Sequence, residues 1–238
     1  MKNNILIALI TLVSILASCK KDNYDPPTSI LKGRIVYQDQ AIGVRTPTIN
    51  LNYNNGGTTS GVQVEIWQDG YQLRTKIPHF VAYDGTWSAA LFDGDYKITL
   101  IKGNGPWVDM TDTISVSVRG NGTLDIPVVP FYLIKNETFQ KTGTTITATF
   151  NVQTVNTTKA LESVRIYLNK TIHVDQNNQM ATGTTLASEI PDLSQPVTVS
   201  VTIPASLANA DYLFARVGIK IAGMAELCYA LPQKIDLK

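Results

Sequence analysis

The stretch from residue 84 to residue 100 constrains the fold of this chain more than any other. Two alternating apolar series flank the dipeptide Asp93-Gly94: Trp87, Ala89 and Leu91 precede it, and Tyr96, Ile98 and Leu100 follow it. Because side chains alternate between the two faces of a β-strand, each series defines one buried strand face. An Asp-Gly pair accepts the positive φ angles of a tight turn. The stretch therefore predicts two strands joined by a short turn.

Alternating stretches of this kind recur along the chain and are separated by clusters of glycine and asparagine. They cover residues 30–37, 62–68, 144–152, 163–168, 197–203 and 212–220. The polar stretch 50–61 has no apolar face to bury, and we expect it to be a loop. Charged residues make up only 16% of the chain, whereas β-branched residues are abundant. This composition is typical of an all-β extracellular protein.

The run Pro127-Val128-Val129-Pro130 divides the alternating stretches into two series. Two prolines mark a junction between domains, because proline interrupts the hydrogen bonding of a sheet. We therefore predict two β-sandwiches in tandem, over residues 29–127 and 131–238. The strand spacing of the second favours an immunoglobulin or fibronectin type III character, although the cysteine pair of immunoglobulin domains is absent.

The N-terminus has the pattern of a secretion signal. Lys2 precedes an apolar run from Ile5 to Leu16, which is too short to span a bilayer. The sequence Leu16-Ala17-Ser18-Cys19 resembles the bacterial lipobox, which implies cleavage after residue 18 and acylation of Cys19. Residues 1–18 are then a lipoprotein signal peptide and residues 19–28 a polar tether. The alternative is a buried apolar helix of a soluble domain.

Charge and cysteine usage exclude other classes. Twenty basic and nineteen acidic residues give a formal charge of +1 without runs, so no basic face for nucleic acid is expected. Cys228 is the only cysteine besides Cys19, which leaves no intrachain disulfide in the mature protein. Its apolar surroundings favour a buried thiol over a nucleophile.

The N-terminal series resembles the carboxypeptidase regulatory-like, or transthyretin-like, sandwich. The carrying motifs are Gly33-Arg34-Ile35-Val36, Gly61-Val62-Gln63-Val64, Asp84-Gly85-Thr86-Trp87 and Gly94-Asp95-Tyr96. The whole chain resembles a family of two-domain Bacteroidetes lipoproteins of unknown function, encoded beside starch-utilisation-system-like transporters. The residues that carry this second resemblance are 33–37, 43–45, 91–97 and 103–107. It implies an outer-membrane lipoprotein on the cell surface or periplasmic face, with a glycan, a transporter and the transporter's binding lipoprotein as partners.

Catalytic motifs are missing from the sequence. His79 and His173 lack ligand-spaced companions, so we expect no metal site and no cofactor. No Gly-x-Ser-x-Gly elbow occurs, and no glycine loop for phosphate precedes a helix. Paired carboxylates for glycoside cleavage would meet only in space, so an enzyme stays the third hypothesis. A calcium ion at Asp93 and Asp95 is left open, although turn chemistry accounts for both residues.

Aromatic residues are the remaining candidates for ligand contact, because sugars stack on aromatic faces while polar groups bind their hydroxyls. We expect Trp87 in the core by register. Trp67 falls on the face opposite Val64 and Ile66, either exposed or packed under a neighbour. Trp107 lies in a turn-rich loop with Asn104 and Asp109, either as a ligand contact or as a loop anchor.

The function that follows is a non-catalytic accessory lipoprotein that binds a glycan for uptake. Trp67, Trp107, Asn104 and Asp109 are its candidate ligand residues, and Cys19 is its lipid attachment site. The alternative is a structural spacer or interaction module that docks on outer-membrane transporter components.

Overall fold

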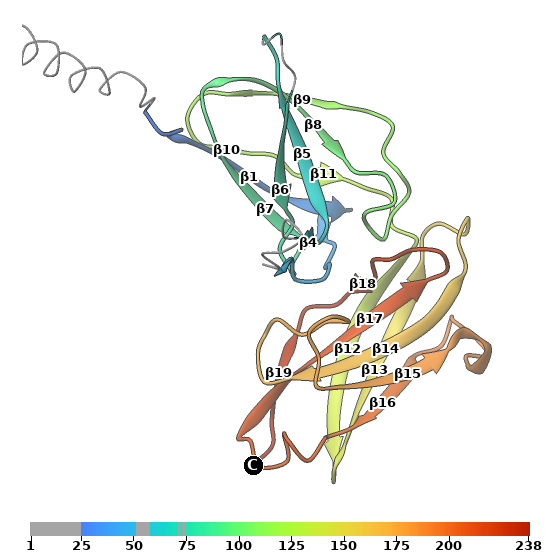
Figure 1. Cartoon of the computed structure of the whole chain (residues 1–238). Helices are drawn as coiled ribbons and strands as arrows, with labels where there is room; N and C mark the ends of the chain where they lie inside the picture. The colour runs from blue at the N-terminus through green and yellow to red at the C-terminus, as the bar shows by residue number, and fades with distance from the viewer. Residues whose placement is uncertain (1–24, 51–57, 71, 73–74) are drawn as a thin grey trace, which may run out of the picture.

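A computed structural model of the chain describes residues 25–50, 58–70, 72 and 75–238. The predicted signal peptide, Cys19 and most of the tether lie outside these residues. Within them, no helix has the length and apolarity needed to cross a membrane. Two β-sandwiches stand end to end, with the C-terminus at the far end of the second (Figure 1). The predicted all-β fold with two tandem sandwiches is confirmed.

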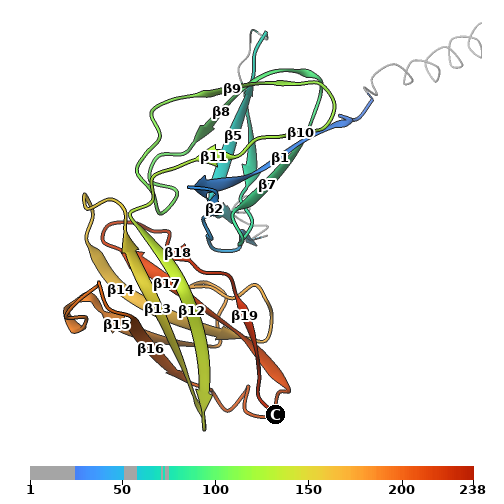
Figure 2. The ribbon, with the colours of Figure 1, turned by 180° about the vertical axis from the view of Figure 1, so that it is seen from behind.

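The first sheet of the N-terminal sandwich is built around β1 (Ser29–Tyr37). This strand pairs antiparallel with β7 (Thr86–Leu91) and with the short β2 (Gln40–Ala41). On its other side it pairs in parallel with β10 (Gly122–Thr123) and β11 (Ile126–Pro127). The central position of β1 is visible from behind in Figure 2. Because β1 lies between β7 and β10–β11, residues 91 positions apart in sequence become neighbours.

The second sheet has the order β6 (Lys76–Phe80), β5 (Gln63–Gln68), β8 (Gly94–Leu100) and β9 (Ile114–Val118). The strands on either side of Asp93-Gly94 therefore belong to different sheets, since β7 pairs with β1 and β8 pairs with β5 and β9. Their predicted inner faces are buried: Trp87, Ala89, Leu91, Tyr96, Ile98 and Leu100 are all 7% exposed or less. The alternation thus identified the core faces correctly.

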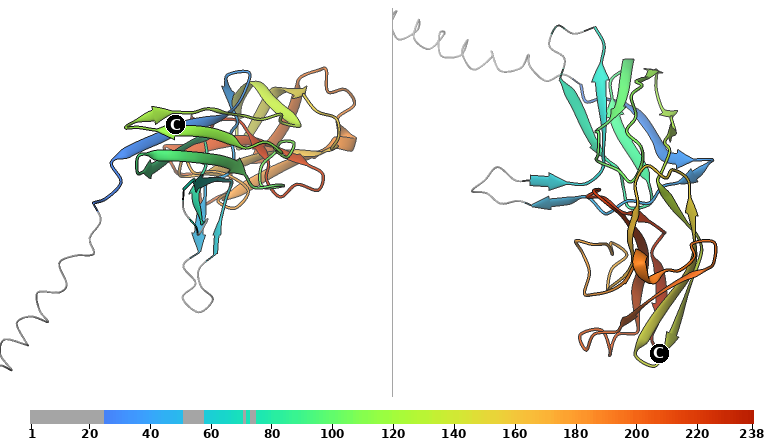
Figure 3. Two further views of the ribbon diagram at one scale, coloured as in Figure 1. Left: turned by 90° about the horizontal axis from the view of Figure 1, so that it is seen from above. Right: turned by 90° about the vertical axis from the view of Figure 1, so that its right-hand side faces the viewer.

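A short antiparallel ribbon projects from the N-terminal sandwich (Figure 3). It consists of β3 (Thr48–Asn50) and β4 (Thr58–Ser60). The prediction of a loop over residues 50–61 is therefore wrong at Asn50 and over 58–60, which are strand. Backbone pairing formed these strands without an apolar face, and the sequence pattern gives no sign of such pairing.

The C-terminal sandwich packs two antiparallel sheets. One contains β12 (Tyr132–Thr142), β13 (Thr145–Thr154) and β16 (Val197–Thr202). The other contains β15 (Ala181–Leu186), β14 (Leu161–Asn169) and β17 (Tyr212–Ile221), and β17 also pairs with β18 (Cys228–Tyr229) and β19 (Gln233–Asp236). A single 3-10 turn, η2 (Ala187–Glu189), follows β15. Inward residues such as Ile146, Ala148 and Phe150 are almost fully buried between the sheets.

The two sandwiches meet through buried charged groups. Arg216 of β17 is fully buried and donates to the carbonyl of Tyr83 in the N-terminal sandwich at 2.7 Å. Glu226 is 1% exposed, accepts from the backbone N–H of Arg45 at 2.7 Å and pairs with the Arg45 guanidinium at 2.8 Å. Asp175, also 1% exposed, accepts from the N–H of Thr46 at 2.8 Å. Three buried charges of one domain thus bind the other.

Candidate ligand-binding groove

The outer face of β1 and β7 forms a groove of about 500 Å³, which we call the β1–β7 groove. In the strand register, Lys32 lies opposite Ser88 and Arg34 lies opposite Thr86. These four side chains point away from the core, because their neighbours Leu31, Ile35, Trp87 and Ala89 point into it. The groove thus lies on the face of the sheet whose polar side chains point to solvent.

One end of the groove carries an ion pair. Arg34 and Asp125 make a fork–fork contact, in which Arg34 Nη2 donates to Asp125 Oδ2 and Arg34 Nε donates to Oδ1 at 3.3 Å and to Oδ2 at 3.1 Å. The backbone N–H of Arg34 also donates to Asp125 Oδ1 at 2.9 Å. The hydrogen bonds from Arg34 lower the pKa of Asp125, and Asp125 in turn raises the pKa of Arg34. A bidentate pair of this kind holds both groups in fixed positions.

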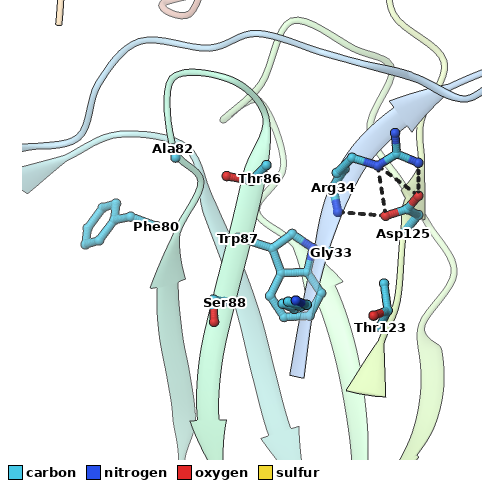
Figure 4. A pocket seen from close by; sticks show the side chains of 10 residues that line it. Gly33, Arg34, Phe80, Ala82, Thr86, Trp87, Ser88, Thr123 and Asp125 are labelled. Carbon is cyan, nitrogen blue, oxygen red and sulfur yellow. Dashed lines mark hydrogen bonds and ion pairs between the residues drawn. The ribbon is translucent and has the colours of Figure 1, made fainter. Parts of the chain in front are cut away.

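Trp87 lies between β7 and β1 below the groove (Figure 4). Its side chain is only 3% exposed, and its Nε1 hydrogen has no acceptor among the described residues. The chain comes close at the neighbouring Gly33, where an added Cβ would lie 1.7 Å from the carbonyl oxygen of Leu124. Only glycine fits this position. The core position predicted for Trp87 agrees with its burial.

The opposite side of the groove is aromatic. Phe80, the last residue of β6, is partly exposed and lies across β7 from the Arg34–Asp125 pair (Figure 4). Lys32 is exposed on the same face, and its ammonium has no hydrogen bond or ion pair with any described residue. The groove combines an aromatic ring, hydroxyls from Thr86, Ser88 and Thr123, and an ion pair that offers both donors and acceptors. Its volume is within the usual range for small-molecule sites.

Trp67, one of the sequence candidates, lies on the other sheet and not in this groove. It is partly exposed, and its Nε1 donates to Thr99 Oγ1 at 3.1 Å. With Lys97 and Asp69, which pair at 3.2 Å, it lines a smaller depression of about 200 Å³. Its exposure is thus intermediate between the two alternatives of an exposed and a packed ring, and the assignment of Trp67 to a ligand site stays a prediction.

The other three residues predicted from the sequence to bind a ligand make structural contacts in and around their own loop. Trp107 is 3% exposed, so its ring offers almost no face to a ligand, and its backbone forms an isolated β-bridge with Pro130. Asn104 accepts from the N–H of Gln63 at 2.7 Å and donates to Gly61 O at 3.1 Å. Asp109 accepts from the N–H of Gly103 at 2.6 Å. The burial of Trp107 agrees with the loop-anchor alternative, and the assignment of Asn104 and Asp109 to a ligand site stays a prediction.

The remaining titratable candidates have structural partners. Asp93 accepts from Ser29 Oγ at 2.5 Å and from Gly120 N at 3.0 Å, which lowers its pKa. Asp95 pairs with Arg119 at 3.4 Å. No group of three or more His, Cys, Asp or Glu side chains converges within the part of the chain that is described. Cys228 is 2% exposed, and burial raises the pKa of its thiol to about 12, so the thiol stays protonated at neutral pH.

The groove residues were not recognised from the sequence. Thr86 and Ser88 could be placed on an outward face, but Phe80, Lys32 and Asp125 come from three other strands or segments. The one feature of the groove that is visible in the sequence is Asp125, a charged residue within the short apolar segment Leu124-Asp125-Ile126. It could have indicated a nearby partner, but not that the partner is Arg34.

The fold and the groove define a class: a tandem β-sandwich protein with a polar, aromatic-edged groove on its first domain. Two family models match the chain, one for each sandwich. "Protein of unknown function (DUF3823) N-terminal domain" matches residues 29–129, and "Domain of unknown function (DUF3823_C)" matches residues 132–234. The chain therefore belongs to the DUF3823 family, as the sequence resemblance to a two-domain family of unknown function indicated.

Solved structures of this family are similar over their whole length. A DUF3823 protein from Bacteroides ovatus is 36% identical, with 88% of this chain and 100% of that chain aligned and a TM-score of 0.78. One from Parabacteroides merdae is 30% identical, with 89% and 100% aligned and a TM-score of 0.76. A protein from Bacteroides uniformis, named a "putative carbohydrate binding protein", shares the fold at 17% identity, with 89% and 100% aligned and a TM-score of 0.68. A comparison with curated proteins returned no match.

Proposed function

We propose that this protein is a non-catalytic lipoprotein that binds a glycan at the outer membrane, with the β1–β7 groove as its binding site. The observation that carries the proposal is the groove itself. It holds about 500 Å³ and places the Phe80 ring across β7 from the Arg34–Asp125 pair. A sugar ring presents C–H groups on one face and hydroxyls at its edge, and the groove supplies a partner for each.

The absence of a second acid in the groove favours binding over catalysis. Glycoside cleavage uses two carboxylates, about 5–9.5 Å apart. Among the residues that line the groove, Asp125 is the only acid, and Arg34 already engages both of its oxygens. An Arg–carboxylate pair held in this way is suited to hydrogen bonding of hydroxyls and poorly suited to proton transfer.

The membrane location rests on the N-terminal sequence and on family resemblance. Acylation of Cys19 would attach the mature chain to the outer membrane, with residues 20–28 as the link to β1. There the protein would deliver glycans to a neighbouring transporter and its binding lipoprotein. The name of the Bacteroides uniformis protein of the same fold supports a carbohydrate ligand.

Binding to a polysaccharide array is the test, with the detergent-solubilised full chain as the sample. The array carries β-glucan, xylan, mannan, arabinan and pectin. Because ring stacking contributes about 0.5–1.5 kcal/mol, Phe80→Ala should weaken binding about two- to tenfold. Phe92→Ala is the matched control, because Phe92 is 49% exposed on the same sandwich and does not line the groove. Absence of binding by the wild-type chain would contradict the proposal.

A second function, docking on a partner protein, has one observation in its favour. Ile30 and Phe92 are 44% and 49% exposed, and Ile30 lies opposite Ala90 on the same outer face. Exposed apolar residues that gather on one face are typical of contact surfaces. Pull-down from solubilised membranes separates the two functions: a spacer would recover transporter proteins, would lose them in Phe92→Ala, and would bind no sugar.

A further inference from the structure

A second cavity lies between the two sandwiches. It holds about 370 Å³, and we call it the inter-domain cleft. Gln40, Ile42 and Asp84 of the N-terminal sandwich line one side, and Ile134, Glu137 and Leu231 of the C-terminal sandwich line the other. Ligand sites form preferentially at domain interfaces, where apolar walls surround a few polar groups. The cleft has this composition.

The backbone is strained on both sides of the cleft. Only three non-glycine residues within the described ranges have positive φ angles: Gln38 and Asp39 at 48° and 63°, and Asn136 at 54°. The first two form the turn immediately before Gln40, and the third immediately precedes Glu137. Positive φ costs free energy in residues with a Cβ and is found preferentially at functional sites.

A β-bulge accompanies Asn136. The pairing of β12 with β13 shifts register between Lys135 and Thr138, so that an extra residue enters β12 at this point. Bulges redirect side chains and are frequent beside binding sites. The bulge coincides with the cleft because Glu137 lines it, while Lys135 Nζ binds Gln40 Oε1 across the domain boundary.

The charged residues that line the cleft are two carboxylates, Asp84 and Glu137. Glu137 has no hydrogen bond or ion pair with any described residue, although it is partly buried. Asp84 uses Oδ1 to accept from Thr86 N and Oγ1, at 3.1 and 2.7 Å. Two carboxylates accept hydrogen bonds from hydroxyls and repel carboxylate or sulfate groups. The cleft is therefore suited to an uncharged sugar unit and not to an acidic one.

The cleft adjoins the β1–β7 groove. Arg34, which pairs with Asp125 in the groove, also donates from Nη1 to the carbonyl of Asp39 at 3.4 Å. Thr86 lines the groove and bonds to Asp84 in the cleft. At the domain boundary, Tyr229 N donates to Gly43 O at 3.0 Å, which holds the two walls together. No residue lines both sites, but these hydrogen bonds link Arg34 and Thr86 of the groove to Asp39, beside the cleft residue Gln40, and to Asp84 of the cleft.

We propose that the inter-domain cleft is a second sugar subsite, which binds an uncharged unit of the glycan whose neighbouring units occupy the β1–β7 groove. This inference rests on the proposed function, and it adds that the ligand is an oligosaccharide contacted by both domains. The C-terminal sandwich is then part of the binding surface. Glycans that would place an acidic unit in the inter-domain cleft are not bound.

Titration calorimetry of the full chain with fragments of two, four and six sugar units tests the inference. The probes are fragments of β-glucan, xylan, mannan and arabinan, together with acidic polygalacturonate. Loss of one hydrogen bond to a charged group lowers the affinity about tenfold. Glu137→Ala should weaken binding of the hexasaccharide about tenfold and leave the disaccharide unchanged. Glu137→Gln, which keeps an acceptor oxygen, should restore most of the loss.

Two further variants give independent results. Asp84→Asn keeps the Oδ1 acceptor for Thr86 but removes the cleft charge, so the turn should stay folded while discrimination against polygalacturonate falls. Glu162→Ala is the control, because this exposed glutamate of β14 pairs with Arg165 at 3.5 Å and does not line the cleft. If cleft variants and wild type bind hexasaccharides equally, the subsite is refuted and the groove stands. If the wild-type chain binds no fragment and no polysaccharide on the array, both proposals fail.

Discussion

The guanidinium of Arg216 in the C-terminal sandwich donates from Nη2 to the backbone carbonyl of Tyr83 in the N-terminal sandwich, at 2.7 Å. The same group donates from Nε to Ala230 O at 2.8 Å and lies 4.4 Å from the centre of the Tyr229 ring. Burial lowers the pKa of Arg216 to about 10, so it stays charged at neutral pH. A buried cation thus binds both domains through carbonyls and an aromatic face.

Removal of this cation should destabilise the chain strongly. Arg216→Leu removes the Arg216 donor from the carbonyl of Ala230, leaves the carbonyl of Tyr83 only its bond from Val44 N, and unbalances the neighbouring charges of Glu226 and Asp175. We expect a loss of about 3–5 kcal/mol in the free energy of unfolding, measured by urea denaturation. Arg216→Lys should recover only part, because an ammonium lacks the planar fork. Arg165→Leu breaks the partly exposed ion pair of Arg165 with Glu162 and should cost less than about 1 kcal/mol.

Stability should depend on pH through Glu226. Burial raises the pKa of this carboxyl from 4.5 to about 7, despite the opposing effect of Arg45. The folded state therefore binds the proton more tightly than the unfolded state, so the free energy of unfolding falls as pH rises from about 4.5 to about 7. At 1.36 kcal/mol per pKa unit, the decrease is about 3 kcal/mol. Glu226→Gln should lack this decrease, and the difference between the two denaturation curves isolates it. Parallel curves over this range would show that Glu226 titrates normally.

Trp107 and Trp67 should contribute differently to the stability of the chain. Trp107→Ala removes a buried ring at the domain junction and should cost about 3–5 kcal/mol in unfolding free energy. Trp67→Ala removes a partly exposed ring and its bond to Thr99, and should cost about 1 kcal/mol. Thermal and urea unfolding of both variants measure this. Equal losses would mean that the burial of Trp107 has no energetic consequence.

Gly33 should not tolerate a side chain. The Cβ of Gly33→Ala would lie 1.7 Å from Leu124 O, so β1 or the segment between β10 and β11 must move. Overpacking of this kind costs about 1–3 kcal/mol. Gly122→Ala is the matched control, because its Cβ would make an ordinary 3.4 Å contact with Leu31. Urea denaturation should separate the two variants, and the Asp125–Arg34 pair should weaken only in Gly33→Ala.

Cys19 should determine where the protein is held. Each buried methylene of an acyl chain adds about 0.8 kcal/mol to membrane binding, so a multiply acylated Cys19 anchors firmly. We expect Cys19→Ala to leave both sandwiches folded and to release or misplace the protein. Carbonate extraction of membranes followed by immunoblotting checks this. Retention of Cys19→Ala protein in the membrane pellet would refute the anchor.

Much of the fold was predictable from the sequence, but little of the binding surface was. Alternation identified the buried faces of β7 and β8, because the period of two relates each residue to its neighbours in the same strand. It did not place these strands in different sheets. Trp107 illustrates the limit for sites: its loop has the composition of an exposed turn, yet its ring is 3% exposed and belongs to the hydrophobic core.

The sequence by itself determined the all-β class, the core faces, the two strand series and the buried thiol of Cys228. Each follows from local periodicity and hydrophobicity, which act over a few residues. Only the tertiary structure brought Asp125 to Arg34 across 91 positions, and Arg216 to Tyr83 across 133. Strand pairing decides such contacts, and pairing depends on long-range packing that a single strand does not encode. The groove and the cleft are products of that pairing.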